Sequence, residues 1–410
     1  MKIRKKKCIL CNAKSVKDLV NFGKTPLANN LIIKSKIKNE KKYPLILGKC
    51  KKCSHVQLSY LPNPKLMFNN YLYLSSASST LTNHLKNIPV AINKIIKIKK
   101  NDLVLDIGSN DGTLLSGYNK YNTIKLGIEP AKNLRKYYKK NNLKLINDYF
   151  NIKVAKKIKK KYGLAKVITA TNVFPHLQKL DEFAKTLNIL LKKRGIVLIE
   201  AHYLGNLIND TAFDTIYHEH CSYWSASSVK KFCDLNNLDL FKVDRLPIHH
   251  GQIRCWIALK GSYKIHKSVN YLIAEEKRHK LHSDLKITRF KNKIINIKKK
   301  INKLFVDIKK RNLIIAGYGA PAKATTFTSF LKIDKNKIPF IFDKNPLKQN
   351  KLLPGSHIPI ISAKKILEKK PDYLFNFAWN FINEIYKQNF KFRKAGGIII
   401  NPIPKIKFYK

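Results

Sequence analysis

Four short apolar segments between residues 103 and 200 constrain the fold of this chain more than any other feature. They occupy residues 103–107, 124–129, 166–171 and 195–200, and stretches of helical character separate them. Continuous apolar runs of this length are typical of strands buried on both faces of a parallel sheet. The sequence therefore predicts an α/β fold, in which helices cover the sheet.

The same alternation starts again after Asn312. Apolar segments at residues 313–316, 339–343, 372–377 and 398–400 predict the strands of a second doubly wound domain. Between the two domains lies a charged helical stretch, in which apolar residues recur every three or four positions from Phe290 to Ile308. That spacing predicts one long connecting helix, with a single apolar face packed on a domain.

We therefore expect four parts. The first is a mixed segment with paired cysteines, the second and fourth are the two α/β domains, and the third is the connecting helix. Their expected ranges are residues 1–95, 96–264, 265–311 and 312–410.

The basic composition does not by itself indicate a nucleic-acid partner. Lys and Arg number 82 against 25 Asp and Glu, a net charge of +57, but only 9 of the 82 are arginine. Surfaces that read bases or clamp phosphates favour arginine for its bidentate geometry. The lysines are also spread along the whole chain, so we interpret them as a solvated surface and expect no specific nucleic acid.

Hydrophobicity and cysteine usage point to a soluble, cytoplasmic protein. A hydrophobic content of 44% excludes a disordered chain, and no apolar run reaches the ~18–20 residues of a membrane helix. The basic N-terminus leads into Cys8 and not into an apolar signal core. In a reducing compartment the seven cysteines favour a metal site or free thiols over disulfides. The pattern does not indicate an oligomeric state.

Two cysteine pairs of identical spacing lie in the first part. Two residues separate Cys8 from Cys11 and Cys50 from Cys53, and 38 residues lie between the pairs. Together they supply four thiolates, the ligand set of a tetrahedral zinc site; four unrelated free thiols are the alternative. Because every position is cysteine, no coordination site is left open, and we expect the zinc ion to be structural.

A strand, a glycine-rich turn and a helix follow from Leu103. The turn contains Asp106, Gly108, Asp111 and Gly112, and its glycines let the backbone approach a ligand closely. The spacing differs from the Gly-x-Gly-x-x-Gly turn that binds a pyrophosphate. The form Asp-x-Gly-x-x-x-Gly, with two acids facing the ligand, indicates cationic adenosylmethionine. An ordinary strand-to-helix turn is the alternative.

Two neighbouring strand ends add polar groups. Glu129, followed by Pro130, ends the next strand, where a carboxylate can accept hydrogen bonds from both ribose hydroxyls of a nucleoside. A third strand ends before Asn172 and His176. Because the ends of parallel strands meet at one edge of a sheet, we expect these groups to line the same crevice.

The run Tyr217-His218-Glu219-His220 concentrates groups that can exchange protons, and His202 precedes it. A metal site, with the two histidines of the run on one face, and a polar surface loop are two interpretations. We favour a general acid/base cluster, since histidine titrates near neutral pH. Glu219 would orient an imidazole, and Tyr217 would stabilise an oxyanion. Such a set suits removal of a proton next to a carbonyl.

A second glycine turn opens the last domain. Gly317, Tyr318 and Gly319 follow a strand, and Lys323 lies at the start of the next helix. Exposed backbone amides and a lysine would suit a diphosphate, and a purely structural turn is the alternative.

Together these residues resemble the nucleotide-sugar C-methyltransferases, which methylate C-3 of dTDP-4-keto-deoxyhexoses. The resemblance covers nearly the whole chain in the same order. It is carried by the cysteine pairs and by residues 26–29, 71–76, 106–112, 217–220, 317–320 and 348–349. The Tyr-His-Glu-His run between the two α/β domains is its most specific part.

The resemblance implies a fold and two cofactors. A class I methyltransferase Rossmann-like domain would bind adenosylmethionine, preceded by a small zinc-binding module. The C-terminal Rossmann-like domain would help to hold the sugar nucleotide.

The resemblance also implies roles for individual residues. His220 would remove the C-3 proton, with Tyr217, Glu219 and His176 around the sugar ring as the other catalytic residues. Adenosylmethionine would contact Asp106, Gly108, Asn110, Asp111, Gly112, Glu129, Pro130 and Asn172. The sugar nucleotide would contact Tyr71, Tyr73, Arg254, Tyr318 and Lys323. Zinc would be held by Cys8, Cys11, Cys50 and Cys53.

One segment departs from the family pattern. His249-His250-Gly251-Gln252 precedes Arg254 where a turn of small residues is expected, so the sugar pocket can differ. Two other functions stay open at this point: an O- or N-methyltransferase of another small molecule, and an RNA-binding or RNA-modifying zinc protein.

Overall fold

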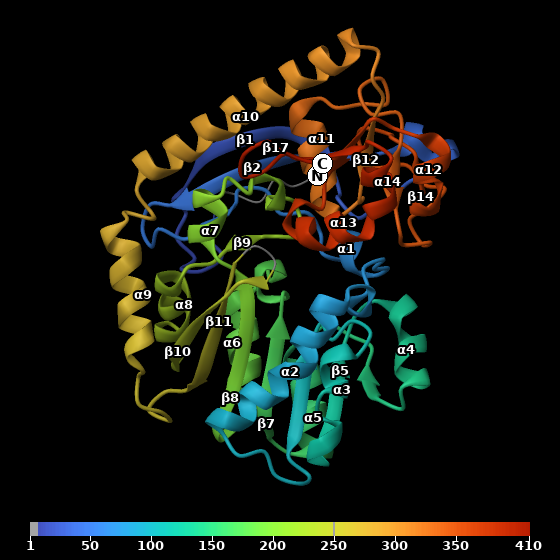
Figure 1. Cartoon of the computed structure of the whole chain (residues 1–410). Coiled ribbons are helices and arrows are strands. Elements are labelled where there is room, and N and C mark those ends of the chain that lie inside the picture. Colours follow the sequence, from blue (N-terminus) through green and yellow to red (C-terminus); the bar gives the residue numbers. More distant parts are fainter. Residues whose placement is uncertain (1–6, 249–250) are drawn as a thin grey trace.

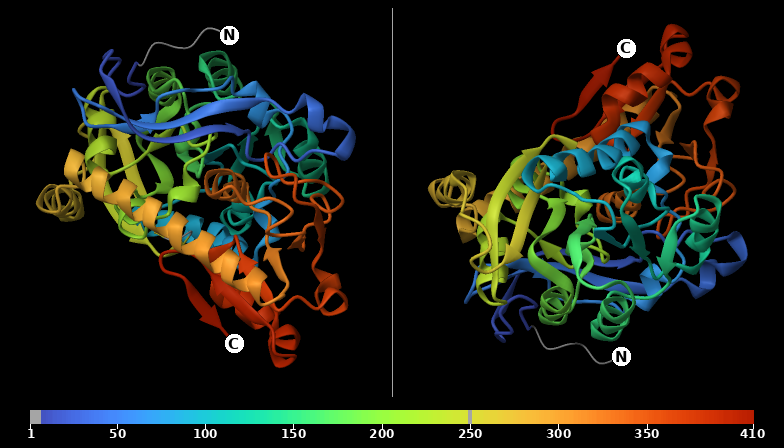
Figure 2. Two further views of the ribbon diagram at one scale, coloured as in Figure 1. Left: turned by 90° about the horizontal axis from the view of Figure 1, so that it is seen from above. Right: turned by 90° about the horizontal axis from the view of Figure 1, so that it is seen from below.

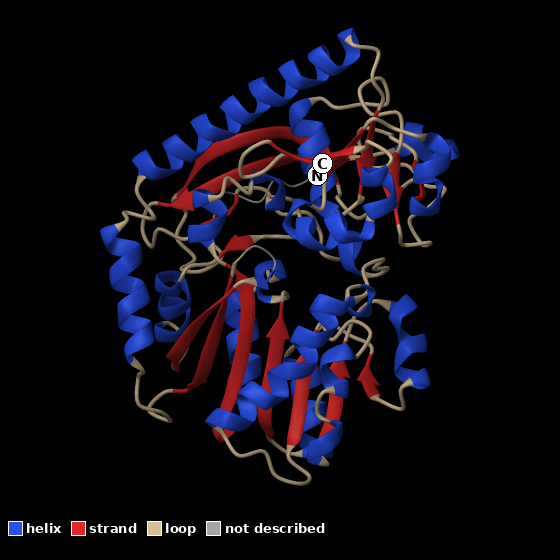
Figure 3. Cartoon of the chain, in the orientation of Figure 1, coloured by secondary structure: helices blue, strands red, loops and turns tan. Residues whose placement is uncertain are grey.

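The computed structural model describes residues 7–248 and 251–410, which form three β-sheets with helices packed on them (Figure 1). The largest sheet occupies the lower half of Figure 3, and the two smaller sheets lie above it. The blue N-terminal and red C-terminal segments lie on opposite sides when the molecule is viewed from above or below (Figure 2). No helix in the described part of the chain is both long and apolar enough to span a membrane.

The N-terminal sheet is antiparallel and contains a strand from a distant part of the chain. Its order is β1 (Val16–Pro26), β2 (Lys42–Cys50), β3 (Val56–Leu58) and β9 (Ser222–Tyr223). Val56 of β3 pairs with Tyr223 of β9. Because β9 follows the Tyr-His-Glu-His run directly, the first sheet fixes one end of that run.

The central sheet is doubly wound and has seven strands in the order β10-β11-β8-β7-β4-β5-β6. Its parallel part comprises β4 (Leu103–Ile107), β5 (Ile124–Ile128), β6 (Lys144–Ile146), β7 (Ala165–Thr171) and β8 (Leu191–His202). The strands β10 (Leu238–Leu246) and β11 (Gln252–Leu259) extend it in antiparallel pairing. The four strands predicted here are confirmed, whereas β6, β10 and β11 were not predicted.

Helices cover both faces of this sheet. Alternate strand residues such as Val104 and Leu198 pack against α2 (Ser79–Ile95), while Leu105 and Val197 belong to the core on the opposite face. The remaining helices of this region are α3 (Thr113–Ser116), α4 (Arg135–Lys140), α5 (Ile152–Tyr162), α6 (Leu180–Leu190), α7 (Leu204–Asn209) and α8 (Ala226–Asp234). The short α1 (Lys65–Phe68) precedes them.

The C-terminal sheet has six strands in the order β14-β13-β12-β15-β16-β17. They are β12 (Ile315–Tyr318), β13 (Ile341–Asp343), β14 (Ile360–Ser362), β15 (Tyr373–Asn376), β16 (Ile398–Asn401) and β17 (Lys407–Tyr409). Its helices are α11 (Ala322–Leu331), α12 (Ile366–Lys369), α13 (Ile382–Gln388) and α14 (Phe390–Lys394). The second α/β domain is thus present, with β17 as an antiparallel edge.

The prediction of a single connecting helix over residues 265–311 is wrong in one respect, because two helices occupy this stretch. They are α9 (Lys267–Arg278) and α10 (Asp284–Lys310). Lys280, two residues after the end of α9, has a φ of 48°. The side chain of Ser283 caps α10 by accepting a hydrogen bond from the Lys286 amide. The apolar face is nevertheless as predicted, since Phe290, Ile294 and Ile301 are buried. The four expected ranges stay a prediction.

Candidate active site and metal centre

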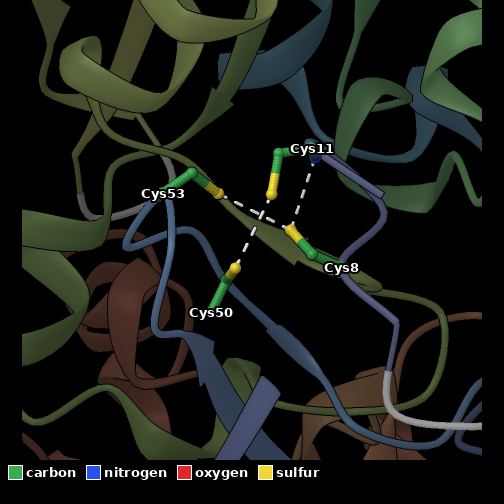
Figure 4. A group of neighbouring side chains, drawn as sticks. All are labelled: Cys8, Cys11, Cys50 and Cys53. Atoms are coloured by element: carbon green, nitrogen blue, oxygen red, sulfur yellow. Dashed lines mark hydrogen bonds between the residues drawn. The ribbon is translucent and has the colours of Figure 1, made fainter. Parts of the chain in front are cut away.

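The four paired cysteines meet in one cluster (Figure 4). All four Sγ atoms lie within 4.8 Å of one another, with 3.6 Å between Cys8 and Cys53 and 3.7 Å between Cys11 and Cys50. Zinc–sulfur bonds of about 2.3 Å in a tetrahedron place sulfurs about 3.8 Å apart. The donor set and its spacing therefore fit a closed, structural zinc site.

A cavity of about 720 Å³ opens at the carboxyl ends of the central strands, and segments that lie outside the strands of the N-terminal and C-terminal sheets complete its wall. The cysteine cluster is not part of this wall. Asp106, Gly108 and Glu129 come from the central sheet, Asn29 follows β1, and Lys323 comes from α11. The cavity is therefore a site that no single domain could form alone.

The glycine-rich turn at this cavity has no room for larger side chains. Gly108 has a φ of +60°, and a Cβ there would lie 2.4 Å from Cγ2 of Val173. The Glu129 carboxylate accepts hydrogen bonds from the backbone amides of Asn110 (3.0 Å) and Ala131 (2.9 Å). These bonds fix the carboxylate at the cavity wall next to the turn.

Two buried acids face the cavity without a cation. Thr169 donates a hydrogen bond of 2.6 Å to Asp106, and burial raises the pKa values of both Asp106 and Glu129 to about 7. Neither acid forms an ion pair within residues 7–248 and 251–410. A positively charged ligand would favour the ionised forms of these two carboxylates and so offset the cost of burying them. The two acids therefore fit adenosylmethionine, which is cationic.

Six of the eight residues expected to contact the cofactor line the cavity, namely Asp106, Gly108, Asn110, Glu129, Pro130 and Asn172. Asp111 and Gly112 do not line it, and their contact with the cofactor stays a prediction. Asp111 accepts hydrogen bonds from the Thr113 and Ser76 amides and thereby joins two backbone segments. Gly112 has a φ of +80° at the start of α3, and a Cβ would meet Leu143 at 2.6 Å. Both residues thus help to shape the turn beside the cavity.

His220 lies at the centre of a group of rings beside this pocket. Its ring centroid is 4.1 Å from that of Tyr217, 5.3 Å from His176 and 5.1 Å from His202. The Nδ1 atom lies 2.7 Å from the carbonyl oxygen of Thr215. A carbonyl can only accept, so Nδ1 carries the hydrogen and Nε2 is the basic nitrogen. Burial lowers the pKa of His220 to about 4, which keeps the ring neutral near pH 7.

Glu219 lies behind the cavity wall and not in it. The Nδ2 atom of Asn29 donates to both of its oxygens, at 2.8 and 3.0 Å, and the Tyr71 hydroxyl donates at 3.3 Å. Asn29 and Tyr71 line the cavity themselves, as do Tyr73 and Tyr217. Burial raises the pKa values of these tyrosines, so their hydroxyls stay protonated.

The C-terminal domain brings two lysines to the cavity. Nζ of Lys323 donates to Oδ1 of Asn380 at 2.6 Å and lies 4.0 Å above the Trp379 ring. Burial lowers the pKa of Lys323 to about 8, although Asp214 lies 3.9 Å away and opposes this shift. Lys348 also lines the cavity. These ammonium groups could bind an anionic part of a ligand.

Two residues expected to contact the sugar nucleotide lie elsewhere. Tyr318 points into the apolar cluster on one face of the C-terminal sheet, with Phe342 and Leu374. Arg254 is paired in register with Glu200 on the neighbouring strand, and its guanidinium contacts that carboxylate at 2.6 and 2.7 Å. Neither lines the cavity. His249 and His250, noted for their departure from the family pattern, lie outside the described residues.

Sequence reasoning missed several cavity residues. Asn29 and Lys348 lie in segments that carry the family resemblance, so a signal for them existed. Trp379 and Asn380 follow β15 in a stretch with no recognisable motif. Only the packing of the C-terminal domain against the central sheet brings these two residues to the site.

Three regions of the chain match known families. Residues 8–68 match a domain described as zinc binding, residues 82–243 a methyltransferase domain, and residues 247–404 a C-methyltransferase C-terminal domain. C-methyltransferase NovU from Streptomyces niveus is 29% identical over 400 residues, which cover 97% of this chain and 95% of that protein. The relative therefore matches across all three regions.

The solved structures that this chain resembles are more distant. A SAM-dependent methyltransferase from Anabaena variabilis is 16% identical with a TM-score of 0.34, covering 43% of this chain and 85% of that chain. An S-adenosylmethionine-dependent methyltransferase from Clostridium acetobutylicum is 10% identical with a TM-score of 0.35, covering 44% and 92%. Scores this low say nothing about the acceptor.

Proposed function

We propose that this protein methylates C-3 of a nucleotide-linked 4-keto-deoxysugar, with dTDP as the favoured nucleotide. The proposal is supported by the matches of its three regions to a zinc-binding domain, a methyltransferase domain and a C-methyltransferase C-terminal domain, and by the similarity to C-methyltransferase NovU. The observation that carries this proposal is the buried, neutral His220 in the wall of the same cavity as Asp106 and Glu129.

His220 is the proposed base. The ketone at C-4 acidifies the hydrogen on C-3, and Nε2 takes that proton while the electrons of the C–H bond move into an enolate. The Thr215 carbonyl accepts from Nδ1 at 2.7 Å and would stabilise the imidazolium that forms. A base that is neutral above a pKa of about 4 is ready to act at pH 7.

Tyr217 is the proposed donor to the enolate oxygen. The Tyr71 hydroxyl already donates to Glu219, whereas no hydrogen bond of the Tyr217 hydroxyl to another side chain is seen in the described part of the chain. Its ring lies 4.1 Å from His220, so one substrate carbonyl could contact both residues. His176, whose ring is stacked with that of His220, would limit how the sugar ring is placed.

Two sets of residues in the cavity lining suit the two ligands. When bound, adenosylmethionine supplies an electrophilic methyl group, and Asp106 and Glu129 would hold its cationic and ribose parts. Lys323 and Lys348 would bind the diphosphate of the sugar nucleotide, since ammonium groups pair well with phosphate oxygens. Tyr73 also lines the cavity and would contact the sugar.

The test is incubation of the protein with methyl-labelled adenosylmethionine and a panel of nucleotide-linked 4-keto-deoxyhexoses, read by mass spectrometry. We expect transfer of one labelled methyl group to carbon. In deuterium oxide with adenosylhomocysteine in place of the donor, we expect deuterium to enter at C-3. An O- or N-methyltransferase would leave that C–H bond intact, so methyl transfer without exchange at C-3 would favour this alternative.

A further inference from the structure

Asn29 connects the N-terminal module to the Tyr-His-Glu-His run. It follows β1 by three residues, and its Nδ2 atom donates to both carboxylate oxygens of Glu219, a residue 190 positions later. Glu219 is only 1% exposed. A buried carboxylate needs donors that replace water, and here a neutral amide supplies the two shortest hydrogen bonds.

We propose that Asn29 is a positioning residue, whose amide holds the Glu219 carboxylate in place so that Glu219 in turn fixes the Tyr71 side chain at the cavity wall. This proposal rests on the proposed function in one point only, namely that the sugar binds at the part of the cavity wall that Tyr71 forms. Asn29 acts through Glu219, and Glu219 is adjacent in sequence to the proposed base, His220.

Helix α11 of the C-terminal domain holds both partners in place. Thr325 donates its hydroxyl to the carbonyl oxygen of Ala28 at 3.1 Å, and Thr326 donates to the carbonyl oxygen of Ile216 at 2.9 Å. These carbonyls belong to the residues directly before Asn29 and Tyr217. Two consecutive threonines therefore set the distance between the segment that carries Asn29 and the run that carries Glu219.

The surroundings of Glu219 make its charge sensitive to Asn29. The titratable groups that interact with it are the phenols Tyr71 and Tyr217, and Glu219 has no ion pair among the described residues. Burial raises the pKa of Glu219 to about 7, while the hydrogen bonds from Asn29 and Tyr71 oppose this rise. Loss of the Asn29 amide should therefore move the titration of Glu219 to higher pH.

The experiment compares Asn29→Ala and Asn29→Asp with Asn30→Ala as the matched control, because Asn30 is the next residue and is exposed. The carboxyl C=O band of Glu219 is followed by infrared spectroscopy against pH, with adenosylhomocysteine and no sugar present. Glu219→Gln removes the band and so assigns it. In Asn29→Ala we expect the midpoint of the Glu219 titration to rise by about one pH unit, as for loss of a hydrogen bond to a charged group. The midpoint should rise further in Asn29→Asp and should not change in Asn30→Ala.

A double-mutant cycle separates positioning from a general structural effect. With a sugar nucleotide that the wild type methylates, Asn29→Ala should lower kcat by roughly tenfold and should change kcat little further in the Glu219→Gln background. Equal losses in both backgrounds would overturn the proposal, as would an unshifted Glu219 band. If the wild type methylates no sugar but the Glu219 band shifts in Asn29→Ala, the proposed function is wrong, whereas the positioning of Glu219 by Asn29 is supported.

Discussion

The Nδ1 atom of His220 lies 2.7 Å from the carbonyl oxygen of Thr215, a bond that sets the tautomer of the ring. Thr215 ends the short 3-10 helix Phe213–Thr215, so the acceptor belongs to rigid backbone. The nitrogen left without a hydrogen, Nε2, belongs to a ring in the cavity wall. This relationship turns a buried histidine into a candidate base and underlies the first prediction.

Replacement of His220 by Asn should abolish methyl transfer while adenosylmethionine still binds, because the pocket acids lie on other elements. A positioned base contributes about 10²–10⁴-fold to a rate, so kcat should fall by at least about a hundredfold. Calorimetry should give a dissociation constant for adenosylmethionine close to that of the wild type. Wild-type turnover in this variant would show that another residue removes the proton.

Binding of adenosylmethionine should weaken as pH falls through about 7. Asp106 and Glu129 have pKa values raised to about 7 by burial, and a cationic ligand favours their ionised forms. Below pH 7 these acids are protonated in the free protein, and binding must release protons, which costs up to about tenfold in affinity per pH unit for each acid. Calorimetry in buffers of different ionisation enthalpy measures the protons released. Glu129→Gln should release fewer protons than the wild type when adenosylmethionine binds. An unchanged number of released protons would argue against a role for Glu129 in binding.

Loss of the zinc site should destabilise the N-terminal sheet. Cys53→Ser removes one of four ligands, and structural zinc contributes on the order of 10 kcal/mol of apparent binding free energy in small domains. By elemental analysis we expect one zinc ion per chain in the wild type and little zinc in Cys53→Ser. The Tm of Cys53→Ser should also be lower than that of the wild type. Cys233→Ser is the control, since Cys233 lies buried in α8 away from the cluster and should leave the zinc content unchanged. Full zinc retention in Cys53→Ser would contradict the four-cysteine site.

Lys323→Met should raise KM for the sugar nucleotide more than it lowers kcat. Lys323 lines the cavity but lies outside the ring group around His220, and a hydrogen bond to a charged group typically contributes about 1.5–3 kcal/mol, or roughly ten- to a hundredfold in affinity. Lys332→Ala, at the exposed end of the same helix, is the matched control and should keep wild-type constants. Steady-state kinetics measure both constants. A KM of Lys323→Met equal to that of the wild type would show that Lys323 does not bind the sugar nucleotide.

The sequence by itself determined the strands and the chemistry of single motifs. Runs such as Leu103–Ile107 predicted buried strands, because four of the five residues are apolar. The equal spacing of the cysteine pairs indicated zinc, and the turn at Gly108 indicated adenosylmethionine, since local geometry limits which residues such turns accept. Within each strand, turn or cysteine pair, the residues that carry the inference lie a few positions apart.

Only the tertiary structure decided which distant residues share a site. Asn29, His220 and Trp379 line one cavity although 191 and 159 positions separate them, and this proximity depends on how the parts of the chain pack together. Arg254 was expected at the substrate but is paired with Glu200, because strand register sets that contact. Tyr318 was expected at the cavity but faces the core of its own sheet, because side chains alternate along a strand. Pairing register and domain packing depend on long-range burial, which the local pattern of a sequence does not record.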